Sequence, residues 1–116
     1  MGGLIGSISF QGCAKPLSLA PLQHRGPDAS RTWLSGDGRC WLGHTRLAIQ
    51  DLSSAGVQPI TSHCGRFTLV FNGEIYNHKQ VRHGLRFQAW RGHSDSETLV
   101  EGLAQRGPAL LLELRG

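Results

Sequence analysis

The chain has 116 residues, of which 39% are hydrophobic and 17% are charged, as is typical of one small globular domain. No apolar run approaches the ~20 residues of a membrane-spanning helix, and no signal peptide opens the chain, so we expect a cytoplasmic protein without a membrane partner. The formal net charge is +4, but its arginines are spread along the chain. Nucleic-acid binding normally requires a basic stripe or a known module, so a nucleic-acid binder is only a third hypothesis.

Three cysteines and six histidines are the candidates for a metal site. Cys13, Cys40 and Cys64 are widely spaced and form no C-x-x-C pair, so neither a disulfide framework nor a zinc motif is indicated. The histidines match no ligand spacing either. We therefore expect no metal site.

The first half of the chain is predicted to be extended and rich in turns. Residues 1–10 predict a strand, and residues 11–23 predict at most a short turn, because Pro16 and Pro21 disfavour a helix. A polar loop follows at residues 24–28. The core candidates of the first strand are Leu4, Ile5, Ile8 and Phe10.

A hairpin is predicted next. Residues 31–34 and 39–42 are short strand candidates, and the Ser-Gly-Asp-Gly segment 35–38 between them is a turn signal. The chain continues extended over residues 43–49. Arg46 lies there between apolar neighbours, as either a solvated strand residue or a rigid fork for a carboxylate.

Residues 67–71 alternate as in a buried or half-buried strand. The strand stops at Asn72-Gly73, a pair that suits tight turns, and Glu74 follows. A strand that delivers an amide, a backbone N–H and a carboxylate to one spot can hold a small polar ligand or an oxyanion. An ordinary turn is the alternative.

Helices are predicted in the last third. Asn77 is a candidate cap for a helix over residues 78–85, and residues 87–90 predict a short strand. Ser94 and Glu97 have capping-box spacing, so a helix should run over residues 95–106, with a further apolar helical segment at 109–114. Asp95 would lie in its first turn, where the helix dipole favours an acid.

Five of these stretches occur together in the order of one family. They are HRGPD (24–28), GHTRLAIQDLS (43–53), QPI (58–60), LVFNGEIYNH (69–78) and HSDSETL (93–99). Together they resemble the N-terminal class II glutamine amidotransferase domain of the glutamine-hydrolysing asparagine synthetases. The resemblance implies an α+β fold, the N-terminal-nucleophile α/β/β/α sandwich of antiparallel sheets. It also implies glutamine as the ligand, which the family hydrolyses to glutamate and ammonia for amide transfer to aspartate.

The resemblance also assigns roles to single residues. Arg46 would bind the α-carboxylate of glutamine, and the Asn72 side chain with the Gly73 N–H would form an oxyanion hole. Glu74 and Asp95 would hold the substrate's α-amino end. The pocket wall would consist of Leu47, Ala48, Ile49 and Gln50.

The nucleophile of the family is missing. The family uses an N-terminal cysteine whose own α-amino group acts as its base, and Gly2 stands at that position. An internal cysteine cannot use its own α-amino group in this way. We therefore expect a chain without glutaminase activity that binds glutamine weakly or not at all.

The resemblance further implies a strand and a hairpin after residue 116. The chain would then be the N-terminal part, residues 1–116, of an amidotransferase domain incomplete at its C-terminus, and marginally stable by itself. The synthetase domain, with its ATP and magnesium, would be absent, so this chain would carry no cofactor and a synthetase domain or subunit would be its partner. The alternative is a non-catalytic glutamine-binding or regulatory module.

Overall fold

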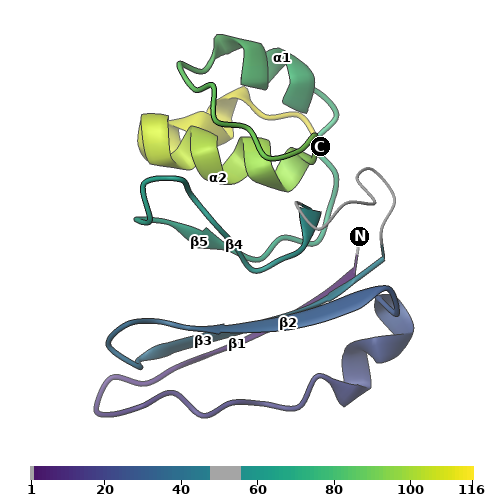
Figure 1. Ribbon diagram of the computed structural model, residues 1–116, viewed down its shortest axis with the longest axis vertical. Coiled ribbons are helices and arrows are strands. Elements are labelled where there is room, and N and C mark those ends of the chain that lie inside the picture. Colours follow the sequence, from purple (N-terminus) through teal and green to yellow (C-terminus); the bar gives the residue numbers. More distant parts are fainter. Residues whose placement is uncertain (1, 48–55) are drawn as a thin grey trace. The chain divides into compact units, whose positions relative to one another are not determined.

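The computed structural model describes residues 2–47 and 56–116, which form two compact units (Figure 1). Of the described residues, unit 1 contains 2–47, 57–59 and 70–72, and unit 2 contains the others. No helix in the described part of the chain is long and apolar enough to cross a membrane.

Unit 1 is built on a three-stranded antiparallel sheet. Its order is β1 (Gly2–Ile8), β3 (Cys40–Arg46), β2 (Ala29–Leu34), so that β3 is the central strand. The predicted hairpin between β2 and β3 is confirmed. Its turn is held by Asp37, whose carboxylate accepts hydrogen bonds from the Ser35 hydroxyl and the Arg39 N–H.

One face of this sheet packs against η1 (Ala20–Arg25), a 3-10 helix. Residues 11–19, which contain Pro16, form no helix, but residues 20–23, predicted as at most a short turn, belong to the 3-10 helix η1. Pro21 is its second residue, where the missing N–H costs nothing. The Thr45 hydroxyl donates a hydrogen bond to the Leu22 carbonyl at 3.0 Å. This contact ties the central strand to η1.

The predicted core of β1 is wrong for three of its four residues. Leu4, Ile8 and Phe10 are exposed by 44%, 67% and 86%, and Ile5 is half-buried. Successive side chains of a strand point to opposite faces, so Leu4 and Ile8 share the face opposite that of Gly3, the residue that meets η1. Alternation predicts that two faces exist but does not tell which one is covered.

A buried histidine lies on the same face of the sheet as Leu4. His44 pairs with Leu4 in the β1–β3 register and is only 3% exposed. Burial lowers the pKa of His44 from 6.5 to about 4; the Phe71 backbone opposes this shift, and the positive charge of Arg46 adds to it. His44 is therefore neutral at pH 7.

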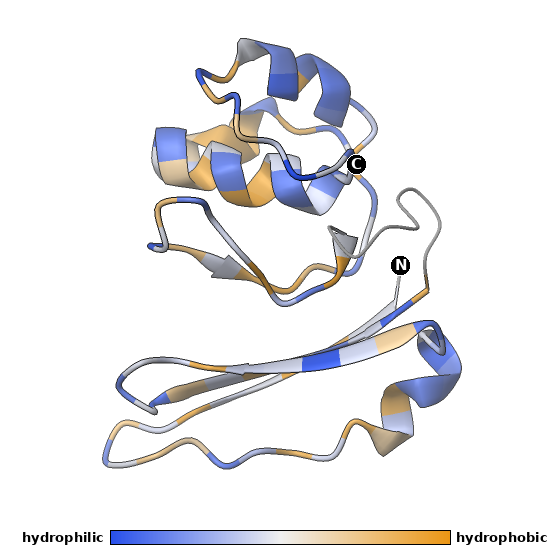
Figure 2. Cartoon of the chain, in the orientation of Figure 1, coloured by the Kyte–Doolittle hydropathy of each residue, from blue (hydrophilic) through white to orange (hydrophobic). Residues whose placement is uncertain are grey.

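Unit 2 is organised around α2 (Asp95–Arg106). The helix α1 (His78–Gly84), the 3-10 helix η3 (Gly107–Glu113) and the short hairpin of β4 (Ile60–Thr61) with β5 (Thr68–Leu69) all contact α2. Apolar and polar stretches alternate along α2 in Figure 2. The core residues of unit 2 are Ile60, Ile75, Val81, Leu85, Leu99, Val100 and Leu110.

The predicted boundaries of α2 are confirmed, because its signals are local. The Ser94 hydroxyl accepts a hydrogen bond from the Glu97 N–H at 3.2 Å, which is the predicted cap. The apolar segment after the helix forms η3, close to its predicted place. There Leu110 packs where a side chain at Gly102 would otherwise lie.

Three other predictions are corrected by tertiary contacts. The strand over residues 67–71 is reduced to β5, since the Phe71 N–H donates to the Gln58 side chain and not to a neighbouring strand. Asn77 precedes α1 as expected but makes no cap bond, because its side chain bonds the backbone of Glu113 and Arg115.

The strand predicted at residues 87–90 is absent from the described structure. The rings of Phe87 and Trp90 pack edge to face with their centroids 4.7 Å apart. The Arg82 guanidinium lies 3.9 Å from the centroid of the Trp90 ring. The described residues thus form a mixed α+β structure with two antiparallel sheets, and the four-layer sandwich stays a prediction.

Replacing Ser94 tests whether its hydroxyl cap stabilises the start of α2. We expect Ser94→Ala to lower the free energy of unfolding by ~1 kcal/mol, since a buried helix N-terminus loses one of its N–H acceptors. Urea denaturation followed by circular dichroism measures this change. Ser30→Ala, on the exposed side of β2, is the matched control and should change stability by less than ~0.5 kcal/mol. Equal effects of the two substitutions would contradict the assignment.

The burial of His44 predicts a pH dependence of stability. Between pH 6.5 and 4 the unfolded chain binds a proton at His44 that the folded chain does not, so stability falls as the pH falls. A shift from 6.5 to about 4 corresponds to at most ~3 kcal/mol. His44→Leu should remove this part of the slope, while the carboxylates titrate alike in both proteins. Denaturation series that keep the same slope in both proteins would show that His44 is protonated without cost.

Candidate functional site

The first residue of β1 and the amide of Asn72 meet in unit 1. The Gly2 N–H donates a hydrogen bond to Asn72 Oδ1 at 3.1 Å. Because the acceptor end of this amide is engaged, its remaining donors are the two N–H groups of Nδ2. The predicted position of the nucleophile and the predicted oxyanion-hole side chain are thus neighbours.

Arg46 lies directly across the sheet from Gly2. The two residues pair in the β1–β3 register, and Arg46 is 8% exposed. The Arg46 carbonyl accepts a hydrogen bond from the Asp28 N–H at 2.9 Å, which fixes its backbone from the side of β2. A guanidinium on a central strand is positioned rigidly enough to bind a carboxylate with two parallel hydrogen bonds.

Two glycines approach the peptide that joins Thr45 to Arg46. A β-carbon at Gly2 would overlap the Thr45 carbonyl oxygen, and one at Gly26 would overlap the Thr45 carbonyl carbon and the Arg46 nitrogen. The Thr45 side chain, itself fully buried, accepts a hydrogen bond from the Gly3 N–H at 3.1 Å. The backbone at Arg46 is therefore enclosed, and position 2 has no room for a side chain in this arrangement.

The second group of predicted residues lies in unit 2. Asp95 is 8% exposed, and its Oδ2 accepts a hydrogen bond from the Ile75 N–H at 2.9 Å. This bond holds the start of α2 against the residue that follows Glu74. The two predicted acids are thus brought to one place, where their charges can bind an ammonium group.

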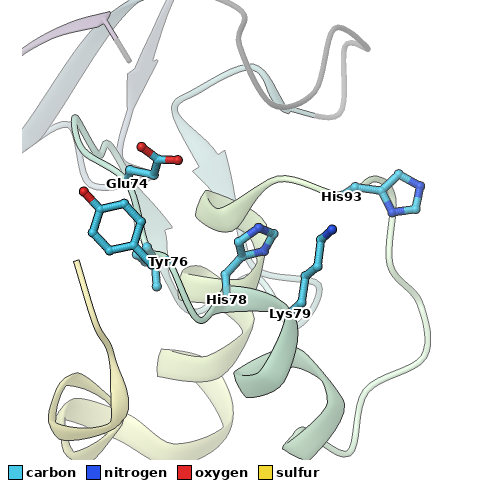
Figure 3. Close-up of a pocket in the computed structure, with 6 residues that line it drawn as sticks. Glu74, Tyr76, His78, Lys79 and His93 are labelled. Carbon is cyan, nitrogen blue, oxygen red and sulfur yellow. The ribbon is translucent and has the colours of Figure 1, made fainter.

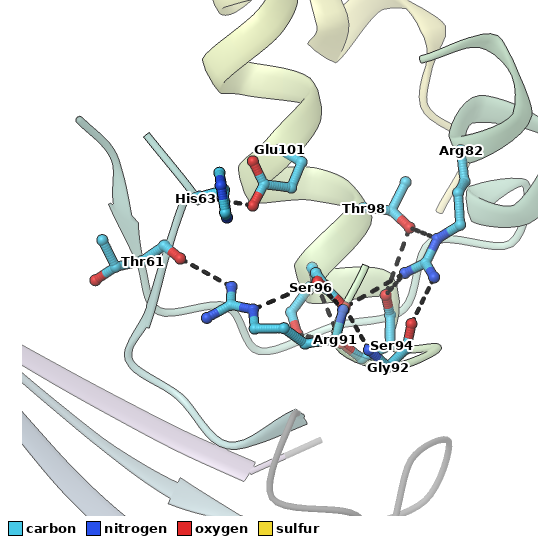
Figure 4. A network of polar contacts seen from close by, with 10 residues as sticks. Thr61, His63, Arg82, Arg91, Gly92, Ser94, Ser96, Thr98 and Glu101 are labelled. Carbon is cyan, nitrogen blue, oxygen red and sulfur yellow. Dashed lines mark hydrogen bonds and ion pairs between the residues drawn. The ribbon is translucent and has the colours of Figure 1, made fainter. Parts of the chain in front are cut away.

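A network of polar contacts, which includes Arg82, Arg91 and Gly92 (Figure 4), surrounds the loop that leads into α2. Glu97, with no exposed surface, accepts hydrogen bonds from the N–H groups of Arg91 at 2.8 Å and Gly92 at 2.9 Å. Its charge is balanced by Arg91 at 3.5 Å and by Arg82 at 3.9 Å. The Arg82 guanidinium also donates to the carbonyls of Gly92 and Ser94, so the loop that leads into Asp95 is fixed on both sides.

A pocket of about 450 Å³ lies beside Glu74. In Figure 3 the Glu74 carboxylate and the Tyr76 hydroxyl lie on one side, and His78, Lys79 and His93 lie on the other. Burial is the main cause that lowers the pKa of His78, and the Asp95 carboxylate opposes it. The pocket therefore places the Glu74 carboxylate on the side opposite the Lys79 ammonium group.

The predicted site residues divide between the two units. Gly2, Arg46 and Asn72 lie in unit 1, whereas Gly73, Glu74 and Asp95 lie in unit 2. Leu47 follows β3, and Ala48, Ile49 and Gln50 fall outside the described residues. No group of three or more His, Cys, Asp or Glu side chains that could hold a metal is found in the part of the chain that the structure describes.

Sequence reasoning missed His44. The available signal was its place two residues before Arg46, which puts both side chains on one face of a strand. Neither ring nitrogen of His44 has a hydrogen-bond partner among the described residues. Burial of this residue depends on tertiary packing, which the sequence pattern does not reveal.

Comparison with known proteins identifies the family of this chain. All 116 residues match the family model described as a glutamine amidotransferase domain. Asparagine synthetase B (glutamine-hydrolysing) of Escherichia coli is 40% identical over 105 residues, which are 88% of this chain and 18% of that protein. The glutamine-hydrolysing asparagine synthetase of Sandersonia aurantiaca is 40% identical over 95 residues, 82% of this chain and 18% of the relative.

A relative of another name matches equally well. Amidase chry2 of Gibberella zeae is 37% identical over 100 residues, which are 85% of this chain and 15% of that protein. The chain thus spans less than a fifth of the length of these relatives. The match over the whole chain, together with the identity to the synthetases, shows that this protein belongs to the glutamine amidotransferase domain family, as a short domain of the asparagine synthetase type.

Proposed function

We propose that this chain is a glutamine-binding amidotransferase domain that binds glutamine without hydrolysing it. The observation that carries the proposal is the hydrogen bond from the Gly2 N–H to Asn72, next to Arg46 across the sheet. These contacts support a role of Arg46 and Asn72 in binding, while the residue at the nucleophile position has no side chain.

The proposed roles follow from the chemistry of each group. Arg46 would bind the α-carboxylate, and Glu74 with Asp95 would bind the α-amino group. Asn72 Nδ2 and the Gly73 N–H would donate to the side-chain carbonyl of glutamine, as an oxyanion hole does. Leu47, Ala48, Ile49 and Gln50 are proposed as the wall of the pocket.

Amide cleavage needs an atom that attacks the carbonyl carbon, and Gly2 supplies none. An oxyanion hole alone stabilises a tetrahedral intermediate that does not form at a useful rate without a nucleophile. The overlap of a β-carbon at Gly2 with the Thr45 carbonyl also argues that the strand has closed over the place of a side chain. This favours the non-catalytic module over an amidotransferase that is merely slow.

The activity of a whole synthetase would lie elsewhere. In such a protein, amide transfer to aspartate would use ATP and magnesium in a synthetase domain or subunit, which we propose as the partner of this domain. The part of the site described here would bind glutamine alone.

The first prediction concerns glutaminase activity, which is measured as release of glutamate from glutamine. We expect the purified chain to release no glutamate from glutamine above a mock purification, with the Escherichia coli relative as the positive control for the assay. Cys13→Ser, Cys40→Ser and Cys64→Ser should leave this background unchanged. Glutamate release that scales with the concentration of the chain would overturn the claim of inactivity.

Binding is tested separately by calorimetric titration with glutamine. We expect measurable binding to the wild-type chain and an affinity at least ~10-fold lower for Arg46→Met, because a charge-assisted pair with the carboxylate is lost. Arg86→Met, which removes an exposed arginine, is the matched control. If the chain stays folded and binds no glutamine, the proposed function is wrong.

A further inference from the structure

The imidazole of His44 has no role in the site as described so far. It is 3% exposed, and neither ring nitrogen has a partner within hydrogen-bonding geometry among the described residues, although the Phe71 backbone is close enough to raise the pKa of the ring. Buried polar atoms are almost always satisfied, and an unsatisfied one costs the folded state its full desolvation penalty. Such a group therefore points to a ligand that satisfies it.

His44 shares a sheet face with Arg46. The two residues are separated by one position on β3, so their side chains point to the same side of the sheet about 7 Å apart along the strand. The guanidinium of Arg46 is close enough to lower the pKa of His44 by its charge. Both side chains thus lie on one face of the sheet, and Arg46 pairs with Gly2, whose N–H donates to Asn72.

The chemistry of a neutral imidazole suits an anionic ligand beside Arg46. It has one N–H donor and one acceptor nitrogen, whereas a carboxylate can accept about four hydrogen bonds. An arginine fork uses two of these positions and leaves others open. A neutral donor can fill one of them without adding a second buried positive charge beside the guanidinium.

Building on the glutamine-binding function above, we propose that His44 donates a hydrogen bond to the same ligand carboxylate that Arg46 binds. His44 is then a second carboxylate-binding residue of this site. The ligand class is an α-amino acid with a free carboxylate. A buried water on the imidazole is the competing explanation, and the titrations below separate the two.

The first experiment is calorimetry on the whole chain with L-glutamine and with L-glutaminol, in which a hydroxymethyl group replaces the carboxylate. We expect His44→Leu to weaken glutamine binding about 10-fold or more, as for a lost hydrogen bond to a charged group. His44→Gln keeps a neutral N–H donor and should retain more of the affinity. His83→Leu removes an exposed histidine of α1 and should bind glutamine like the wild type.

Glutaminol separates a ligand role from a structural role. Its affinity should be weak and equal for the wild type and His44→Leu, since neither complex contains the carboxylate. At pH 7 His44→Leu should be at least as stable as the wild type, because it removes unsatisfied buried nitrogens. A structural role would instead lower stability and weaken both ligands together.

The second experiment needs no variant and covers the case in which His44→Leu does not fold. Nuclear magnetic resonance follows the His44 ring in the wild-type chain, where bound glutamine should raise its pKa and glutaminol should not. Unchanged ring signals with glutamine, or equal affinity of His44→Leu and wild type, overturn this inference but leave glutamine binding intact. A wild-type chain that binds no glutamine overturns both proposals.

Discussion

The close contact of two glycines with one peptide bond determines the arrangement of unit 1. Gly2 and Gly26 each come so near the Thr45–Arg46 peptide that a β-carbon on either would overlap it. In the antiparallel register of β1 on β3, Gly2 pairs with Arg46, and at the same end of β3 the Arg46 carbonyl accepts a hydrogen bond from the Asp28 N–H. The backbone that carries Arg46 is therefore restrained by sterics as well as by hydrogen bonds.

Unit 2 differs from unit 1 in that it buries charged carboxylate side chains. Glu97 and Asp95 lie in the first turn of α2, where the helix dipole favours a negative charge. Both carboxylates accept backbone N–H groups from loops that have no other regular partner, at Ile75 and at Arg91–Gly92. The buried carboxylates thus bind the backbone N–H groups of these loops in the way that a neighbouring strand would. Of the two acids, Asp95 is also a proposed ligand group.

Local signals explain the parts that the sequence predicts. The hairpin of β2 and β3 follows from Asp37 in its turn, and the start of α2 follows from the Ser94 hydroxyl. Both depend on groups within five residues of each other. The candidate site residues came instead from the five family motifs. The order of these motifs along the chain identifies the family even though the motifs do not predict how the residues lie in space.

Predictions failed where a distant partner competes with the local pattern. The Phe71 N–H bonds the Gln58 side chain, and the Asn77 side chain bonds the backbone near Glu113. Likewise, His44 is buried, whereas Leu4, which pairs with it on the adjacent strand, is 44% exposed although it was a predicted core residue. Alternation sets the face of a side chain, and tertiary packing alone decides whether that face is covered.

In the proposed function, binding and chemistry would be separable, because they would use different parts of the chain. The proposed binding groups are side chains fixed on β3 and at the start of α2, together with an amide held by a backbone N–H. None of these contacts needs a side chain at position 2. Under this proposal, a missing nucleophile there would remove one step of the reaction and leave the other contacts in place. The close approach of β1 to the Thr45 carbonyl leaves room for glycine alone at position 2. Reintroducing a thiol at Gly2 would therefore require the first residues of β1 to move away from β3, at the expense of the same register that places Arg46.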